Sequence, residues 1–460
     1  MSVASQPSLN AANPVTRAFI VSSGATVLVI VAFLIVFGVS PIPFVLATGA
    51  LLILWLVCRH PVGSLGIFLM FIPVFTLTFL LAKFFGPPYV AWLQGSDRAA
   101  LLLVTVVLWW RNGIKLSTPD WFLLACFGAA ILRLAFGGTL IGLLTDFSFM
   151  IAYAAGRMTV LTTDQEKLWA RRAVWTVAVL SVLGMIEVFF IGEGPRTLLY
   201  LSAAAGGTQG GALDAAFHGE GYLGLRESST MFGPLQFAPL CMAGLILWWV
   251  YCRDRIPGIM IAAGLICSVT RSAWVGTALA VGVLALLMQQ AKRFLLYTAL
   301  ALGLFLAAIP ILGLGDYLFT TKTGQDPSAQ GHRESIFEGL KYVSNHPLGI
   351  GPGNVGKYAV KNDYAAAGFE NTYLTFAAEY GIANALCFIG FLASLLMMLL
   401  RARTQSAYVA IGIVVGFSAI MMFAALHDVF PLACWLWFPV GLAIRSSVKQ
   451  SDSEAFAASA

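Results

Sequence analysis

The fold is decided by residues 256–290, which read IPGIMIAAGLICSVTRSAWVGTALAVGVLALLMQQ. Two apolar runs, 256–270 and 272–290, meet with one charged residue, Arg271, between them. Runs of this kind are typical of membrane-buried helices, because a helix needs about 20 apolar residues to cross the hydrocarbon core of a bilayer. The stretch therefore predicts a helical hairpin in a membrane, with an arginine at its turn.

The composition of the whole chain supports the same class. Of 460 residues, 59% are hydrophobic and 10% are charged, and the mean hydropathy is +0.85. A soluble domain carries about a quarter charged residues, and a soluble protein of this size needs a charged surface that this composition cannot supply. Soluble enzymes, nucleic-acid-binding proteins and disordered chains are therefore excluded. The seven cysteines lie mostly in apolar runs without a CxxC motif, which predicts neither a disulfide framework nor a metal site.

Similar apolar runs recur along the chain and predict an all-α fold. We expect a polytopic transmembrane helical bundle of about 12–14 spans, with a long extracytoplasmic loop that carries short helices. One of these is an amphipathic helix over 333–344 on the outer surface of the membrane. The expected divisions are a cytoplasmic tail (1–17), N-terminal transmembrane helices (18–191), a periplasmic loop with the central transmembrane helices (192–314), a large periplasmic loop (315–370), C-terminal transmembrane helices (371–446) and a cytoplasmic tail (447–460).

The basic residues predict the orientation. With the N-terminus in the cytoplasm, 16 of the 27 Lys and Arg residues fall in short inside connections or at span ends, as the positive-inside rule requires. Both termini are then cytoplasmic, and both long polar stretches lie outside. The inside connections contain no phosphate-binding loop and no dinucleotide-binding fingerprint. This disfavours an ATP-driven pump and a cytoplasmic nucleotide-sugar transferase.

Two arginine clusters fall on the outer face in this topology. Arg226 begins the motif RESSTMFGP at the entrance to an apolar run, where its charge and the positive end of a helix dipole could bind an anion. The alternative is a snorkelling arginine beside a helix N-cap. Arg271 costs about 2.5 kcal/mol or more if it lies at mid-bilayer, so it needs a partner or a function. The alternative is a simple turn charge.

Two further clusters complete the outer face. The segment NHPLGIGPGN at 345–354 predicts tight turns whose backbone amides can approach a ligand, although on its own this pattern favours a plain turn. Glu370 precedes an apolar run, where the helix dipole favours a carboxylate, and Glu379 lies deeper in the same run. His427 and Asp428 add another ionisable pair. Arginines match pyrophosphate oxygens, and a carboxylate or histidine can accept a hydroxyl proton, so this equipment suits group transfer from a lipid pyrophosphate.

The order of the motifs RESSTMFGP, SVTRSAWVG, NHPLGIGPGN and ENTYL resembles the O-antigen ligase/polymerase superfamily, over about residues 140–430. The resemblance implies a metal-independent inverting glycosyltransferase of the bacterial inner membrane that needs no cofactor. Such an enzyme polymerises or ligates undecaprenyl-pyrophosphate-linked oligosaccharide at the periplasmic face, in exopolysaccharide, O-antigen or capsule biosynthesis. The implied partners are that lipid-linked oligosaccharide, as donor and acceptor, membrane lipids and a chain-length-regulating co-polymerase, with no nucleic acid.

The resemblance also implies roles for single residues. Arg271 matches the family's arginine in the SRS/TRS turn, and Arg226 matches the arginine before an earlier Gly-Pro span; both would hold the donor pyrophosphate. Glu370 stands where ligases have the histidine of an HNxYL motif. This departure favours a polymerase-like member with Glu370 as the catalytic base, and His346 is the alternative base. The expected substrate-binding residues are Arg333, His332, His346, Asn371, Tyr373 and Asn354.

Two other functions remain open at this point. A lipid-linked-sugar flippase or secondary transporter would use broken helices and intramembrane ionisable groups, and the chain has Pro234 and Pro239 in one run and Asp146 and Glu187 in others. A non-catalytic scaffold is the weakest alternative, because it gives no reason for Arg271 in so short a hairpin. The motifs do not specify the sugar or the linkage.

Overall fold

The computed structural model describes residues 54–74, 77, 87–192, 194, 227, 229–231, 233–252, 254–311, 327–355, 369–427 and 429–459. Within these ranges the backbone is helical and contains no strand, which confirms the all-α class. The chain divides into two compact units, residues 1–64 and 65–460. Apart from the residues before Leu65, the features described below belong to the second unit.

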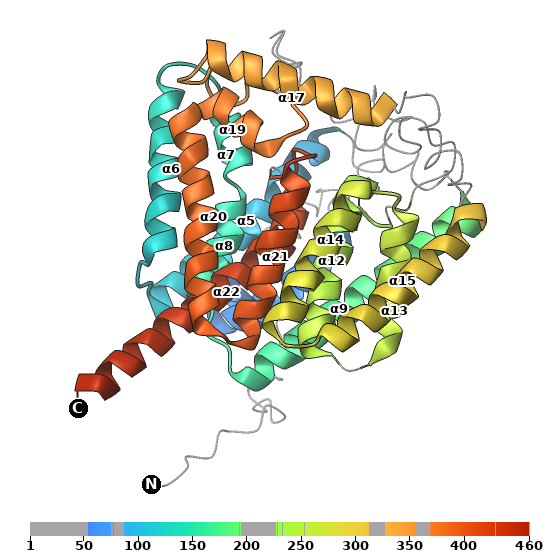
Figure 1. Cartoon of the computed structure of the whole chain (residues 1–460). Coiled ribbons are helices and arrows are strands. Elements are labelled where there is room, and N and C mark those ends of the chain that lie inside the picture. The colour runs from blue at the N-terminus through green and yellow to red at the C-terminus, as the bar shows by residue number, and fades with distance from the viewer. Residues whose placement is uncertain are drawn as a thin grey trace, which may run out of the picture. The chain divides into compact units, whose positions relative to one another are not determined.

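Fifteen α-helices account for most of the described backbone (Figure 1). They are α3 (Pro61–Phe71), α5 (Pro87–Asn112), α6 (Thr118–Leu134), α7 (Leu140–Asp146), α8 (Phe149–Met158), α9 (Thr163–Ile186), α12 (Pro234–Tyr251), α13 (Arg255–Cys267), α14 (Arg271–Leu287), α15 (Ala291–Ile311), α17 (Pro327–Asn345), α19 (Thr372–Tyr380), α20 (Ile382–Ala402), α21 (Gln405–Met421) and α22 (Phe430–Ser459).

The protein is a multi-pass membrane protein. By length and composition, four described helical segments can cross a bilayer, namely Thr163–Ile191, Pro234–Tyr251, Ile382–Ala402 and Phe430–Lys449. Helices α7 and α8 form a fifth candidate that is bent by 47° at the break between them. Helices α13, α14 and α21 are among the shorter apolar helices. The total of 12–14 spans stays a prediction.

Helix α12 lies inside the bundle, and small residues bring its neighbours close together. Almost all of its side chains are buried, as expected for a helix that is apolar on every face. Around it, α14 meets α21 where a Cβ on Gly276 would lie 2.6 Å from the carbonyl oxygen of Gly416. Likewise, a Cβ on Gly156 of α8 would lie 3.0 Å from the Cα of Gly441 of α22. Such small-residue crossings are typical of membrane helices, whose association depends on close packing.

The apolar run that follows Glu370 is broken in the structure. Helix α19 ends at Tyr380 and α20 begins at Ile382, because Gly381 adopts a φ of +91°. A side chain does not fit here, since a Cβ on Gly381 would lie 2.8 Å from the Leu348 carbonyl oxygen. The Ile382 N–H donates to the Pro347 carbonyl at 2.9 Å. The loop that follows α17 therefore packs into the break between α19 and α20.

Helix α17 confirms the helix expected over 333–344. It runs from Pro327 to Asn345 and crosses the end of the bundle above α19 (Figure 1). Helices α17 and α19 can approach closely at Gly339, since a Cβ there would lie 2.9 Å from a Leu374 methyl group. Phe337 and Leu340 remain exposed on α17. The helix thus has a side packed on α19 and exposed apolar groups as well.

One buried ion pair ties α6 to α8. The Arg157 Nη2 lies 2.7 Å from the Asp120 carboxylate, and both side chains are almost fully buried. The Tyr153 hydroxyl donates to the same carboxylate at 2.9 Å, and the Arg157 guanidinium also donates to the Lys115 carbonyl at 2.7 Å. In the sequence, Arg157 is one of the 16 basic residues that we assigned to the cytoplasmic side by the positive-inside rule. The structure shows that it also neutralises a buried carboxylate.

Replacing Arg157 with alanine should destabilise the protein by about 3–5 kcal/mol, because it leaves the Asp120 charge buried and uncompensated. Thermal unfolding in detergent micelles measures this loss. The control is Arg401→Ala at an exposed position, for which a change within about 0.5 kcal/mol is expected. The double variant Arg157→Met with Asp120→Leu should recover much of the loss. Equal stability of Arg157→Ala and Arg401→Ala would contradict the assignment.

Candidate active site at the end of helix α21

The C-terminal end of α21 is where the separate motifs meet. The first turns of α14 pack against it, since Gly276 lies against Gly416 and Ile420. The start of α19 is bonded to the same end: the Asn371 side-chain amide donates to the Met422 carbonyl at 3.0 Å, and the Tyr373 hydroxyl donates to the Ser418 carbonyl at 3.1 Å. Residues that are about 100 positions apart in sequence are therefore brought to one end of the bundle.

Arg271 is the first residue of α14 and is half-buried. The turn before it is tight, because Val269 has a φ of +48° and the Thr270 hydroxyl donates to the Ser268 carbonyl at 3.1 Å. The Glu227 N–H donates to the Cys267 carbonyl at 3.0 Å. This bond joins the RESSTMFGP segment to the turn of the predicted hairpin. Arg226 itself lies outside the described residues.

Glu227 is a site residue to which the sequence analysis assigned no role. Its side chain is 0% exposed, although it belongs to a polar motif. A Cβ on Gly184 would lie 2.4 Å from a Glu227 carboxylate oxygen, and one on Gly264 would lie 3.2 Å from it. Its position directly after Arg226 was the available signal, but nothing in the pattern indicated burial. The carboxylate lies behind the turn that carries Arg271.

The structure joins two predicted site residues directly. The His332 Nδ1 contacts the Glu370 Oε2 between α17 and α19. The Glu370 N–H donates to the Ser335 hydroxyl at 3.0 Å, and the His332 ring lies 6.4 Å from the Phe423 ring. Glu370 is 56% and His332 is 34% exposed. The pair is accessible to a substrate and lies beside the end of α21.

Asn371 and Tyr373 of the ENTYL motif have positioning contacts. The Asn371 Oδ1 accepts the Leu374 N–H at 3.1 Å and caps α19, while its amide nitrogen is bonded to α21. The Thr372 hydroxyl donates to the Ala424 carbonyl at 3.0 Å. These bonds fix the start of α19 and so place Glu370. The roles of Asn371 and Tyr373 toward a substrate stay predictions.

The other three predicted substrate-binding residues have local contacts as well. Arg333 lies over the Phe337 ring, 5.7 Å from its centroid. His346 is exposed, stacks on Tyr342 with ring centroids 4.5 Å apart, and has its Nδ1 3.1 Å from the Tyr342 carbonyl oxygen. Asn354 is buried and donates to the Ile350 carbonyl at 2.8 Å. Their roles toward a substrate stay predictions.

The Gly/Pro loop at 346–355 is pinned to the bundle by backbone hydrogen bonds. The Ile350 and Gly351 N–H groups donate at 2.8 Å to the Ala378 and Glu379 carbonyls. On the other side the Thr139 N–H donates to the Pro352 carbonyl at 2.8 Å, and the Arg133 guanidinium donates to the Gly349 carbonyl. The loop therefore bridges α19 and the turn before α7.

Behind this loop lies a buried ionisable cluster of Asp146, Glu379, Tyr380 and His427, each at most 6% exposed. The Glu379 Oε1 accepts the Gly353 and Val355 N–H groups at 3.2 Å each. The Tyr380 hydroxyl donates to Asp146 at 2.6 Å, and the His427 Nε2 lies 3.4 Å from Asp146.

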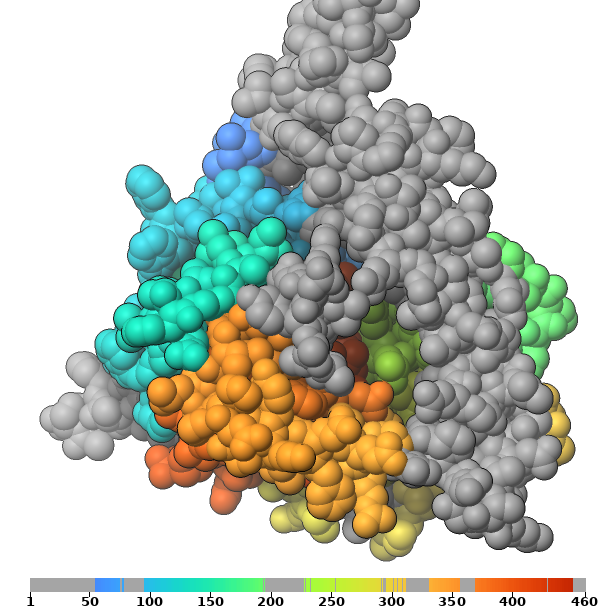
Figure 2. All heavy atoms as spheres, turned by 90° about the horizontal axis from the view of Figure 1, so that it is seen from above, coloured from blue at the N-terminus to red at the C-terminus, as the bar shows by residue number. Residues whose placement is uncertain are grey.

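The face above these groups is hollowed beside α17 (Figure 2). In this view α17 and the start of α19 border the depression, and yellow-green residues near the start of α12 are visible at its floor. Among the described residues, no three His, Cys, Asp or Glu side chains are grouped to hold a metal ion. The polar groups that the structure describes at this face are arginine, histidine and carboxylate side chains and backbone amides.

Replacing Gly351 with alanine should loosen the loop. Gly351 has a φ of +100°, and a Cβ would meet the backbone of Gly137 and Gly138, so we expect a loss of about 1–3 kcal/mol. Limited proteolysis in detergent should cut faster within 346–355. The control is Gly303→Ala, where nothing lies within 4 Å of the added Cβ and a helix gains up to about 1 kcal/mol from alanine. Unchanged cleavage in Gly351→Ala would refute the pinned loop.

The comparisons with known proteins agree with this arrangement. No curated protein sequence matches the chain. The family model described as O-antigen ligase matches residues 256–389. The matched range begins in α13, includes Arg271, α17, the pinned loop and Glu370, and ends in α20. Residues 256–389 of this multi-pass membrane protein are therefore similar to the O-antigen ligase family.

Proposed function

We propose that the protein is an inverting glycosyltransferase that polymerises polyprenyl-pyrophosphate-linked oligosaccharide repeat units at the periplasmic face of the bacterial inner membrane. The observation that carries the proposal is the meeting of Arg271 and the Glu370–His332 pair at one end of α21. A cationic group for a leaving phosphate and a base for an attacking hydroxyl are the two requirements of this reaction. The family domain supports the same class of chemistry.

Arg271 is the proposed ligand of the donor pyrophosphate. Its position at the start of α14 adds the positive end of the helix dipole to the charge of the guanidinium. As the bond between the anomeric carbon and the pyrophosphate oxygen breaks, negative charge grows on the leaving group, and Arg271 stabilises it. Arg226 is the proposed second cation, from the segment that Glu227 joins to the same turn.

Glu370 is the proposed base, with His332 as its partner. The carboxylate holds the imidazole at Nδ1, so the two groups can take up the proton of the acceptor hydroxyl as a unit. The hydroxyl oxygen then bonds to the anomeric carbon on the face opposite the pyrophosphate, and a single displacement inverts that centre. His346 is less suited as base, because its Nδ1 faces the Tyr342 carbonyl and its ring stacks on Tyr342.

A flippase or secondary transporter is the second candidate, and the buried cluster of Asp146, Glu379 and His427 favours it. Ionisable groups inside a helical membrane bundle are costly and commonly line proton or ion pathways. The cluster also adjoins the bent α7–α8 pair. Transport requires two compartments, whereas glycosyl transfer does not, so an assay in detergent separates the two functions.

The test uses purified protein in detergent with the native lipid-linked oligosaccharide, and product length is scored on a gel. The wild type should form polymer. Arg271→Ala and Glu370→Gln should each lower the rate about 100-fold or more, the size typical of lost charge stabilisation or a lost general base.

Two matched controls should keep the wild-type rate. Glu338→Gln changes an exposed acid on α17, and Arg401→Ala changes an exposed arginine at the end of α20. Full-length polymer from both site variants, at normal membrane levels, would contradict the mechanism. If the wild type made no polymer in detergent, the transport alternative would gain support.

A further inference from the structure

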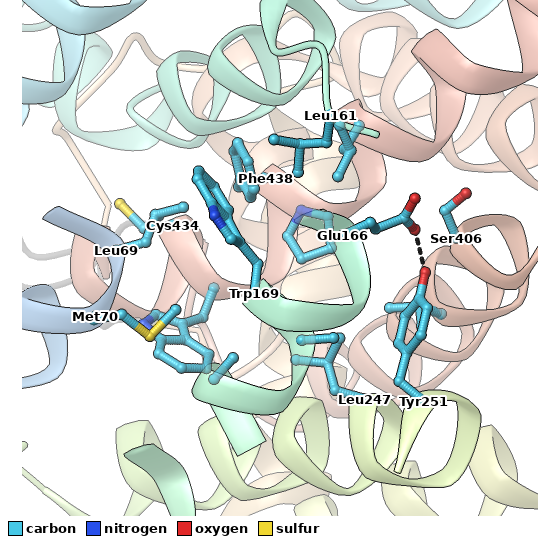
Figure 3. Close-up of a pocket in the computed structure, with 16 residues that line it drawn as sticks. Leu69, Met70, Leu161, Glu166, Trp169, Leu247, Tyr251, Ser406, Cys434 and Phe438 are labelled. Carbon is cyan, nitrogen blue, oxygen red and sulfur yellow. Dashed lines mark hydrogen bonds between the residues drawn. The ribbon is translucent and has the colours of Figure 1, made fainter. Parts of the chain in front are cut away.

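A cavity lies at the end of the bundle opposite the site (Figure 3). Its lining includes Ser406 in the first turn of α21 and Tyr251 at the end of α12. Because α21 has 17 residues and rises 1.5 Å per residue, its two ends are about 25 Å apart. The cavity has an empty volume of about 600 Å³, part of it open at its mouth. It is therefore separate from the groups around Arg271 and Glu370.

The lining is divided into a polar side and an apolar side. Figure 3 shows Glu166, Tyr251 and Ser406 together, with the Tyr251 hydroxyl donating to the Glu166 carboxylate. The remaining lining side chains are mainly apolar and aromatic, among them Trp169, Leu247, Trp435, Phe438 and Leu442. Pockets that are lined mainly by apolar side chains, with a few grouped polar side chains, are typical ligand sites. The lining suits a molecule with an apolar chain and a polar head.

The charges select the head group. Among the described residues that line the cavity, Glu166 has the one charged side chain, and a carboxylate repels a phosphate but accepts hydrogen bonds from an ammonium group. Two exposed cations follow Glu166 in α9: Lys167 is the next residue, and Arg171 lies about one helical turn beyond Lys167. A carboxylate next to two cations complements a head group that carries both an ammonium and a phosphate.

We propose that this cavity binds an acyl chain of a membrane aminophospholipid, with the ammonium at Glu166 and the phosphate toward Lys167 and Arg171. The ligand class is phosphatidylethanolamine. Acyl chains are already in an apolar medium in the bilayer, so their transfer into the cavity brings little hydrophobic gain. Selectivity therefore depends on the head group, and above all on the Glu166 carboxylate. The proposal is independent of the proposed glycosyl transfer.

The test measures lipid binding to delipidated protein in detergent by native mass spectrometry, with phosphatidylethanolamine, phosphatidylcholine and phosphatidylglycerol of equal chain length. The wild type should bind phosphatidylethanolamine at least 10-fold tighter than either other lipid. Phosphatidylcholine cannot donate hydrogen bonds to Glu166, and phosphatidylglycerol lacks the ammonium. Equal binding of the three lipids, or preference for the anionic lipid, would overturn the proposal.

Two test variants and one control variant accompany this measurement. Glu166→Gln conserves the shape of the side chain and should abolish the head-group preference, whereas Glu338→Gln on α17 should keep it. Ala173→Phe adds a ring to a residue that lines the cavity and should reduce binding of all three lipids. An unchanged preference in Glu166→Gln, or unchanged binding in Ala173→Phe, would place the lipid elsewhere. Glu166→Gln should still make polymer, so its result does not depend on the proposed reaction.

Discussion

The Glu379 carboxyl is the group on which the site end of the bundle, near the C-terminal end of α21, depends. One of its oxygens accepts the N–H groups of Gly353 and Val355, and its backbone carbonyl accepts the Gly351 N–H. A buried polar group of this kind is costly unless its hydrogen bonds are made. Satisfying Glu379 therefore holds the loop after α17 against α19. The break at Gly381 and the close approach of the loop to the turn before α7 follow from this requirement.

The C-terminal end of α21 is where both α19 and α14 are attached. Helix α19 is fixed at one end by Glu379 and its loop, and at the other by the bonds of Asn371 and Tyr373 to the end of α21. Helix α14 packs on that end through Gly276. Glu370 and Arg271 stand at the starts of these two helices. Rigid helices thus position both charged groups, which is what a site for charge stabilisation and proton transfer requires.

Much of this could be predicted from sequence, because apolar periodicity and helix ends are local. The hairpin at Arg271 and the helix over 333–344 both follow from short stretches of residues. The partnerships could not be predicted, because they join distant positions. Tyr380 and Asp146 are 234 residues apart, and Arg157 and Asp120 are 37 apart. The break at Gly381 depends on the Leu348 carbonyl, and Glu370 meets His332 only because α17 crosses α19.

A cryo-EM structure of the full chain with a polyprenyl-pyrophosphate-linked oligosaccharide, the proposed donor, tests most directly whether Arg271, Glu370 and His332 form one site. We expect pyrophosphate density at Arg271, and the first sugar within reach of Glu370 and His332 beside the end of α21. Pyrophosphate bound away from Arg271, with Glu370 and His332 remote from the sugar, would contradict this expectation.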